Sequence, residues 1–248
     1  MTIRSSATGW LRAAAGLPER AARTGAGLVS APVEAIRAPS AALARERYRG
    51  QAGLYDIATA AGRPYRDDAV LRLRPRAGEV VLDVGCGTGL NFAEIEQGIG
   101  AEGRLVGIDC SPEMLARARD RSARCGWANV TLIEAPAEAA EAPLPADAAL
   151  LCGTHDILRS PAALGNILRQ LKPGARIVAG GPKWAPPWQP GAPALNILTW
   201  QLNRSYVTTF EGFDRPWSHL ARVVPDLTVE EVFFGGGYIA EGRRPPRA

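Results

Sequence analysis

Short apolar runs and amphipathic stretches alternate along most of the chain after residue 40. Runs rich in Val, Ile and Leu predict strands at 79–84, 104–109, 129–133, 147–152 and 175–180. Helical periodicity predicts helices between them at 89–97, 112–124 and 161–171. Two of these helices start at a Ser-Pro pair, where a capping hydroxyl precedes a first-turn proline. The alternation predicts an α/β protein with a mostly parallel sheet and helices on both faces.

The pattern changes on either side of this alternating region. Upstream, Ser40 is placed to cap a helix over 41–50, and a second helix is predicted near 66–74. Downstream, strand-like runs at 227–234 and 237–242 meet at a Gly-Gly pair and predict an antiparallel hairpin at the end of the sheet. With these two runs, the predicted sheet has seven strands.

Two segments do not fit the alternation. Residues 1–40 are rich in Ala, Arg, Gly and Pro, and proline or glycine interrupts every helical pattern there. We expect a basic, weakly ordered arm or lid, with a weak contact to a membrane surface as an alternative. Residues 182–222 are too aromatic and too long for a simple connection. We therefore expect one domain over 41–248, in which 182–222 is an inserted aromatic cap that binds the substrate.

Charge and cysteine content exclude several classes of protein. Residues 1–50 carry an excess of five positive charges while the whole chain carries +4, so the rest is nearly neutral and lacks the basic stripe of a nucleic-acid enzyme. The four cysteines form no C-x-x-C pair and accompany no His cluster. We expect no metal site and a reduced, cytoplasmic protein. The sequence has no run of about 18 apolar residues that would predict a transmembrane helix.

The stretch VVLDVGCGTGL, residues 80–90, ends a strand in an aspartate and a glycine-rich turn. Such a turn lets a ligand approach the backbone and aims a helix N-terminus at it. Leu90 stands where the dinucleotide fingerprint has its third glycine, and the Asp83 carboxylate would repel a pyrophosphate. Asp109 ends the next strand, where a carboxylate can bind both hydroxyls of a ribose. The two acids predict a site for a nucleoside with a cationic tail and no phosphates, such as S-adenosylmethionine.

Three motifs resemble those of class I S-adenosylmethionine-dependent methyltransferases. VVLDVGCGTGL is similar to the first motif of the family, GIDCSPEML to its second strand, and LKPGARIVAGG to the approach to its fifth strand. The upstream stretch RYRGQAGLYDIATAAG carries a "YD" element and is similar to the small-molecule and lipid branch, which includes quinone and phosphatidylethanolamine methyltransferases. The resemblance implies a Rossmann-like class I methyltransferase fold, S-adenosylmethionine as cofactor and S-adenosylhomocysteine as product.

The resemblance also implies roles for individual residues. The glycines would line the methionine part of the cofactor, Asp83 would hold its ammonium group directly or through water, and Asp109 would bind the ribose. Cys110 and Met114 would flank the adenine. The implied cofactor-binding set is Tyr55, Asp83, Gly85, Cys86, Gly87, Gly89, Asp109, Cys110, Met114, Pro136, Ala137 and Cys152.

One position departs from the pattern of the family. Members commonly have an acid after the third strand that bonds the adenine amino group, and here the aligned residue is Pro136. Glu134 and Glu138 bracket it. Either one of these carboxylates or the backbone takes over the contact, or the adenine is held by stacking alone.

Candidates for proton transfer follow the fourth strand in LLCGTHDILRS. His155 and Asp156 lie there, and histidine is the side chain best matched to proton transfer near pH 7. The alternative is that the pair anchors the loop. Candidates for contact with the methyl acceptor are Trp184, Trp188, Trp200, Tyr206, Phe210, Trp217 and His219. A plain hydrophobic mini-core would give the same pattern.

The expected function is methyl transfer to a hydrophobic small molecule, such as a secondary metabolite or a quinone-like ring, at an O, N or C atom. One alternative is a phospholipid N-methyltransferase that uses the basic arm on an anionic membrane. Another is a non-catalytic partner protein with the same fold. An RNA substrate is disfavoured by the missing basic stripe, and a monomer or a homodimer is expected.

Overall fold

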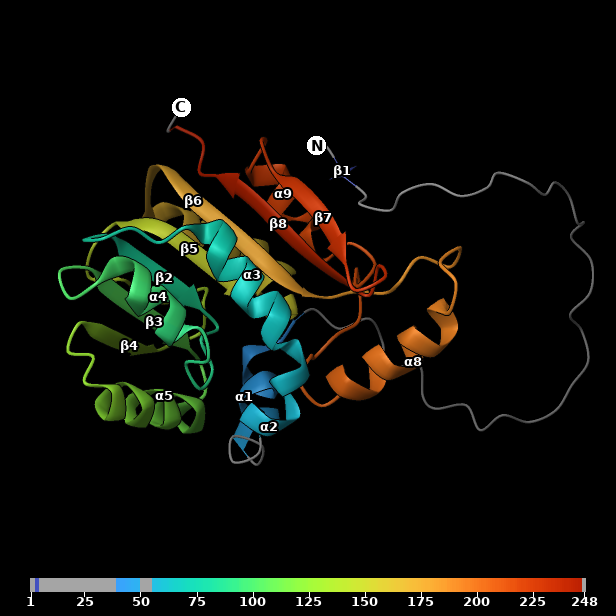
Figure 1. The fold of residues 1–248 in the computed structure, drawn as a ribbon, viewed down its shortest axis with the longest axis horizontal. Coiled ribbons are helices and arrows are strands. Elements are labelled where there is room, and N and C mark those ends of the chain that lie inside the picture. The colour runs from blue at the N-terminus through green and yellow to red at the C-terminus, as the bar shows by residue number, and fades with distance from the viewer. Residues whose placement is uncertain (1–2, 5–38, 50–54, 247–248) are drawn as a thin grey trace, which may run out of the picture.

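One eight-stranded sheet forms the centre of the computed structural model, which describes residues 3–4, 39–49 and 55–246 of the 248-residue chain (Figure 1). The strands are β1 (Ile3–Arg4), β2 (Val80–Val84), β3 (Arg104–Asp109), β4 (Val130–Glu134), β5 (Ala146–Cys152), β6 (Leu171–Pro182), β7 (Thr228–Val232) and β8 (Gly237–Arg243). Their order across the sheet is β1-β7-β8-β6-β5-β2-β3-β4. Only β8 is antiparallel to its neighbours.

The predicted seven-stranded, mostly parallel sheet with a C-terminal hairpin is confirmed. Each of those strands begins and ends within two residues of its prediction except β6, which starts four residues earlier, at Leu171. The eighth strand, β1, is a two-residue edge strand parallel to β7, and it comes from the segment expected to be a weakly ordered arm. The other residues of that arm, apart from 39 and 40, lie outside the described part of the chain.

Helices connect the strands and also form a separate group near the C-terminus. The α-helices are α1 (Ala41–Arg49), α2 (Tyr55–Ala58), α3 (Arg63–Leu73), α4 (Phe92–Ile99), α5 (Pro112–Cys125), α6 (His155–Leu158), α7 (Pro161–Gln170), α8 (Ala192–Asn203) and α9 (Leu220–Val223). Two 3-10 helices are η1 (Ala60–Gly62) and η2 (Pro216–Ser218). The helix starts at Ser40, Ser111 and Ser160 are confirmed, because each Oγ accepts a backbone N–H three residues on.

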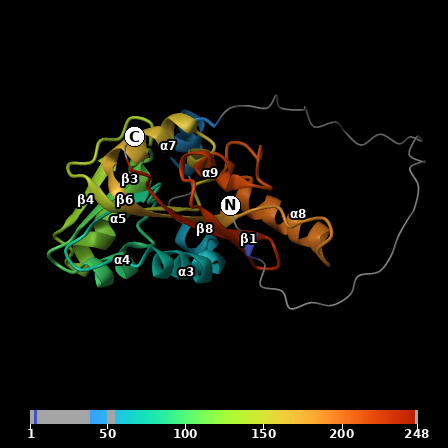
Figure 2. The ribbon, with the colours of Figure 1, turned by 90° about the horizontal axis from the view of Figure 1, so that it is seen from above.

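The sheet is covered on both faces (Figure 2). Helices α3, α4 and α5 lie on one face, and α7 and α9 lie on the other. Strand residues alternate between two apolar cores: Val81 and Leu105 pack with α3 and α4, whereas Leu82 and Val106 pack with α7. Fully burying such a side chain stabilises the fold by about 1.5–3 kcal/mol. The alternation therefore fixes which face of the sheet each strand residue turns to, and with it the register of the strands.

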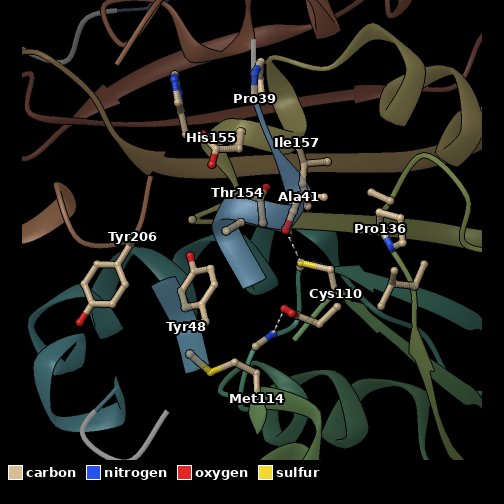
Figure 3. A pocket seen from close by; sticks show the side chains of 18 of the residues that line it. Pro39, Ala41, Tyr48, Cys110, Met114, Pro136, Thr154, His155, Ile157 and Tyr206 are labelled. Atoms are coloured by element: carbon tan, nitrogen blue, oxygen red, sulfur yellow. Dashed lines mark hydrogen bonds between the residues drawn. The ribbon is translucent and has the colours of Figure 1, made fainter. Parts of the chain in front are cut away.

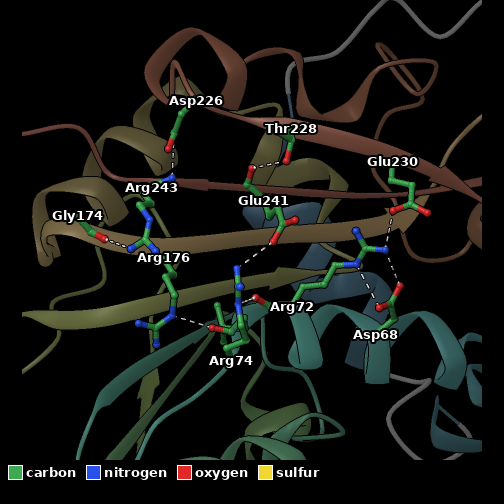
Figure 4. Close-up of polar contacts among 11 residues, drawn as sticks. Asp68, Arg72, Arg74, Gly174, Arg176, Asp226, Thr228, Glu230, Glu241 and Arg243 are labelled. Carbon is green, nitrogen blue, oxygen red and sulfur yellow. Dashed lines mark hydrogen bonds and ion pairs between the residues drawn. The ribbon is translucent and has the colours of Figure 1, made fainter. Parts of the chain in front are cut away.

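Ion pairs attach α3 to the C-terminal hairpin (Figure 4). The Arg72 guanidinium donates to Glu230 of β7 at 2.8 Å and to Asp68 one turn back on α3 at 3.2 Å. Behind them, Arg176 of β6 pairs with Glu79 and donates to the carbonyl of Leu73 at 2.8 Å. Single partly exposed pairs contribute little stability. Their consequence is positional, because α3 carries Tyr65, which lines the second of the two cavities described below but not the first.

Helix α8 lies in the aromatic segment 182–222, for which no helix was predicted. It projects away from the sheet (Figure 1), and its twelve residues include no charged side chain. Ile197, Leu198 and Leu202 are more than half exposed. None of the helices among the described residues has the length and apolar character that crossing a bilayer requires.

Candidate functional site

A cavity lies where the parallel strands end. Its lining includes the residues directly after β2, β3, β4 and β5, together with α1 and the loop after α8. We call it the strand-end cavity. It is lined among others by Tyr48, Tyr55, Gly85, Gly87, Asp109, Cys110, Met114, Pro136, Ala137, Glu138, Thr154, His155, Asp156 and Tyr206. Ligands of open α/β sheets bind at this edge.

Asp109 is the carboxylate that the structure places in this cavity. Its Oδ2 accepts the N–H of Gly87 and its Oδ1 accepts the N–H of Ser111, both at 2.9 Å. Burial raises the pKa of Asp109, while these N–H groups oppose the shift. Each carboxylate oxygen has a second acceptor site, so Asp109 can still receive the two hydroxyls of a ribose. Asp109 therefore lies where the sequence predicted it, at the tip of β3.

The glycine turn after β2 has the left-handed backbone that glycine tolerates best. Gly85 has φ of +71° and Gly87 has φ of +54°. A Cβ on Gly87 would meet only a ring atom of Tyr55, at 3.9 Å, so the space above this residue is open for a ligand. A Cβ on Gly85 would collide with Thr154 at 2.5 Å. Gly89 instead packs against Phe92 and does not line the cavity.

Asp83 is placed differently from its expected role. It is fully buried, and both of its oxygens accept from Asn91 Nδ2 at 3.1 and 3.3 Å. Burial raises its pKa to about 7, although the Asn91 bonds oppose the shift. Asp83 does not line the cavity, so any link to an ammonium group runs through other atoms. Cys86 and Cys152 likewise do not line the strand-end cavity, because they pack with the apolar core beside α3 and α4.

The far side of the strand-end cavity is mostly apolar. Cys110, Met114, Pro136 and Ala137 line it as expected (Figure 3), and burial raises the pKa of the Cys110 thiol to about 11. Glu138 also lines it, whereas the carboxylate of Glu134 pairs with Arg45 at 3.1 Å. Of the two acids that bracket Pro136, Glu138 is therefore the one within reach of a ligand.

Three tyrosines stand over the opposite side of the cavity. Tyr48 stacks on Tyr206 with ring centroids 6.0 Å apart (Figure 3). Tyr55 meets Tyr206 edge-on, with ring centroids 5.4 Å apart. Burial raises the pKa of Tyr48 and of Tyr55, so both hydroxyls stay neutral. Tyr55 was expected to close over the cofactor, and it lines the strand-end cavity. These rings separate the strand-end cavity from a second one.

The second cavity, which we call the tyrosine cavity, lies between α3, α8 and the hairpin of β7 and β8. Its lining includes Tyr48, Tyr55, Tyr65, Thr154, Leu195, Leu198, Leu202, Tyr206, Phe233 and Tyr238. Phe233 meets Tyr65 edge-on at 6.4 Å and adopts φ of +51°, which is rare for a bulky residue. The two cavities adjoin at the end of β5, because they share Tyr48, Tyr55, Gly153, Thr154, His155, Tyr206 and Val207.

His155 and Asp156 hold the loop that follows α8. His155 Nε2 lies 3.1 Å from the carbonyl of Glu211, and because a carbonyl only accepts, Nε2 carries the proton. Its ring packs on Phe213 with centroids 4.7 Å apart, and Nδ1 is buried. Asp156 Oδ2 accepts the N–H of Thr208 at 2.8 Å. The geometry matches the anchoring alternative, although both residues also line the strand-end cavity.

Most of the expected aromatic contacts lie away from both cavities. Trp184 and Phe210 stack on each other at 5.2 Å. Trp217 is buried against Tyr238, Trp188 is 81% exposed, and the Trp200 ring faces the Arg204 guanidinium at 5.0 Å. His219 is half-buried and lines neither cavity. Of the seven residues expected to bind the acceptor, only Tyr206 lines the cavities.

Several lining residues were missed from the sequence. Tyr48 and Tyr65 carried a usable signal, because each is the one aromatic residue of its helix. Leu195, Leu198 and Phe233 carried none, since α8 and the hairpin turn reach the cavity only through tertiary packing.

The residues present fit S-adenosylmethionine. Asp109 offers acceptors to a ribose, the open space over Gly87 admits the methionine part, and Cys110 with Met114 forms an apolar wall for a base. Thr154 Oγ1 and Asp156 Oδ1 are buried without a hydrogen-bond partner, and both residues line the cavity. Such atoms need partners, and a ligand with polar groups supplies them.

Comparison with known proteins supports the same conclusion. A family model described as a methyltransferase domain matches residues 81–174. The ubiquinone/menaquinone biosynthesis C-methyltransferase UbiE of Methylococcus capsulatus is 32% identical over 145 residues, which are 55% of this chain and 58% of that protein. The aklanonic acid methyltransferase DauC of Streptomyces sp. strain C5 is 32% identical over 111 residues, 44% of this chain and 50% of that protein.

Solved structures show the same fold. The N-methyltransferase NodS of Bradyrhizobium japonicum in complex with S-adenosylhomocysteine superposes with a TM-score of 0.51 at 19% identity, over 74% of this chain and 87% of that one. The chain therefore has a Rossmann-like methyltransferase fold, and residues 81–174 match a methyltransferase domain. Together with the strand-end cavity, these findings support S-adenosylmethionine as the cofactor.

The chain matches its curated relatives over only part of their length. The chain spans 36%, 58% and 50% of the first three relatives that it matches. The acceptor therefore has to be argued from the site of this chain.

Proposed function

We propose that the chain transfers a methyl group from S-adenosylmethionine to an uncharged, hydrophobic small molecule held in the tyrosine cavity. The observation that carries this proposal is the contact between the two cavities, which share Tyr55, Thr154 and Tyr206. Among the described residues, those that line the tyrosine cavity include no Asp, Glu, Lys or Arg. Apolar pockets with a few hydroxyl groups bind hydrophobic small molecules.

The residues of the chain would align the cofactor with the methyl acceptor and exclude water from between them. When bound, S-adenosylmethionine supplies a methyl group on a cationic sulfur. Asp109 would fix the ribose, and the rings of Tyr48, Tyr55 and Tyr206 would cover the reacting region. Holding two reactants in line supplies much of the rate gain in such a displacement.

No described side chain at the tyrosine cavity is placed as a strong base. Burial raises the pKa of Tyr65 and Tyr238, so their hydroxyls do not ionise near neutral pH. His155 lines both cavities, but burial lowers its pKa to about 4, so the ring is a weak base. We infer an acceptor that needs little help to lose its proton, such as an acidic phenolic hydroxyl or an electron-rich ring carbon. The name of the UbiE relative, a C-methyltransferase of ubiquinone and menaquinone biosynthesis, fits a carbon acceptor.

The other candidate acceptors receive less support. A phospholipid headgroup carries a phosphate, which would meet no Lys or Arg among the described residues of the tyrosine cavity. A non-catalytic partner protein would not need an apolar cavity beside its cofactor site. A weak membrane contact through residues 5–38 lies outside the described part of the chain.

The test combines binding with transfer. Calorimetry should show S-adenosylmethionine and S-adenosylhomocysteine binding to the purified chain. Transfer of a labelled methyl group should then be measured to 1,4-dihydroxynaphthalene, to a hydroxyanthraquinone and to vesicles of phosphatidylethanolamine. We expect label in one of the ring compounds and none in the lipid. Label in the lipid alone, or binding without transfer to any ring compound tested, contradicts the proposal.

A further inference from the structure

Asp56 makes two short contacts across the cofactor side of the site. Its Oδ1 accepts a hydrogen bond from Thr88 Oγ1 at 2.6 Å, and its Oδ2 accepts from the Arg121 guanidinium at 2.6 Å. Arg121 also donates its Nε–H to the carbonyl of Thr88 at 3.0 Å. The three residues come from α2, from the glycine turn and from α5, so they close a ring of contacts among three separate segments.

Thr88 connects this ring to the cofactor site. It is 1% exposed and directly follows Gly87, whose N–H bonds Asp109. Asp56 and Asp109 therefore hold consecutive residues of one turn from two sides. Charge-assisted hydrogen bonds of this length are the stronger kind.

Helix α2 depends on such contacts for its position. It has four residues, none of them fully buried, and Ile57 is 76% exposed. A single helical turn is not stable by itself, because nucleation is unfavourable. Apart from the ring stacking of Tyr55, the described side chains that connect α2 to the glycine turn and to α5 are those of Asp56, Thr88 and Arg121.

Tyr55 is the residue for which the position of α2 matters. It precedes Asp56, lines both cavities, and lies with Cε1 3.9 Å from where a Cβ on Gly87 would be. We propose that Asp56 is a positioning residue that latches α2 onto the glycine turn, so that Tyr55 covers the bound cofactor. The proposal rests on the cofactor site of the proposed function and not on the acceptor.

The test is a double-mutant cycle in the full chain, read by calorimetric binding of S-adenosylhomocysteine. Asp56→Ala and Thr88→Val should each raise the Kd about tenfold, the scale of one lost charge-assisted hydrogen bond. Tyr55→Ala should raise it as well. In the Tyr55→Ala background, Asp56→Ala should add less than about twofold, since residues that act through one another are not additive.

A matched control and a second measurement separate positioning from general stability. Asp68→Ala removes an acid that pairs with Arg72 on α3 and lines neither cavity, so it should leave the Kd unchanged. In the ligand-free protein, hydrogen–deuterium exchange of segment 55–62 should be faster in Thr88→Val, a variant that keeps the shape of the side chain. If Asp56→Ala does not fold, Thr88→Val alone tests the latch through its Kd and its rate of hydrogen–deuterium exchange.

Three outcomes overturn the latch: an unchanged Kd in both Asp56→Ala and Thr88→Val, full additivity with Tyr55→Ala, or an equal effect of Asp68→Ala. If the wild-type chain binds S-adenosylhomocysteine but methylates no acceptor, the proposed function fails while the latch stands. If the wild-type chain shows no binding at all, both are overturned.

Discussion

The Asp109 carboxylate accepts the backbone N–H of Gly87 at 2.9 Å and so joins the tip of β3 to the turn after β2. The bond fixes the turn whether or not a ligand is present. It also leaves acceptor sites on the same carboxylate that face the strand-end cavity. One side chain thus shapes the strand-end cavity and is also the ribose ligand that we propose.

Replacing Asp109 should weaken cofactor binding more than it weakens the fold. For Asp109→Asn we expect the Kd for S-adenosylhomocysteine to rise about ten- to hundredfold, the scale of one or two hydrogen bonds to a charged group. Calorimetry measures this directly. Asp147→Asn is the matched control, because Asp147 also accepts a backbone N–H, that of Val80 at 3.0 Å, but lines neither cavity. Equal losses in both variants would assign Asp109 to structure alone.

Asp83 should affect stability and not cofactor affinity. Its pKa is raised to about 7 by burial, so the folded state holds a proton that the unfolded state releases near pH 4. Wild-type stability is therefore lost as the pH rises from about 4 to 7. Asp83→Asn does not titrate. The difference between its free energy of unfolding and that of the wild type should therefore increase by up to several kcal/mol as the pH rises across that window. Urea titrations at several pH values measure this difference. If Asp83→Asn changes the Kd for S-adenosylhomocysteine more than about threefold, Asp83 has a direct role in binding after all.

His155 should make the free energy of unfolding depend on pH with the opposite sign. Burial lowers its pKa to about 4, from an unfolded value near 6.5. Its contribution to stability is complete above about pH 6.5 and is lost as the pH falls toward 4. Relative to His155→Phe, the wild type should lose about 1.4 kcal/mol per pH unit in that window. His219→Gln is the control with a smaller slope, since His219 is half-buried. A slope near zero for the difference between wild type and His155→Phe would contradict the buried, neutral ring.

The rim of the tyrosine cavity can be tested with two neighbouring residues of α8. Leu198 lines the cavity and is 51% exposed, whereas Ile197 is 62% exposed and lines neither cavity. Leu198→Asp places a charge where an apolar acceptor would bind, so the KM for a ring acceptor should rise at least about tenfold. Ile197→Asp should leave it unchanged, and both should keep the Kd for S-adenosylhomocysteine. Matching effects of the two substitutions on KM would place the acceptor elsewhere.

The sequence predicted the sheet because its signals are local. β-branched runs, Ser-Pro helix starts and a glycine-rich turn each act within about ten residues of chain. The position of Asp109 could be predicted for the same reason, since the carboxyl end of a parallel strand has a known place in the sheet. Its role as the ribose ligand stays a prediction.

The acceptor side could not be predicted in the same way. Tryptophans in 182–222 indicated an aromatic pocket, but Trp184 and Trp217 pack into the protein and Trp188 faces outward. Composition does not say which face of a segment turns inward when no strand or heptad pattern constrains it. Asp83 was misplaced for a related reason: a strand-end acid can bond a neighbouring amide, here that of Asn91, as readily as a ligand.

The antiparallel course of β8 has a consequence for how the chain could change its selectivity. Because β8 runs back between β6 and β7, the turn at 233–236 returns to the edge of the sheet from which 183–191 departs. Much of the acceptor side thus belongs to one continuous stretch, whereas Asp109 and the glycine turn are encoded far upstream. If the proposed function holds, a chimera that exchanges 183–236 should change which acceptor is methylated. It would keep Asp109 and the glycine turn of the cofactor site, although Tyr206 would be exchanged as well.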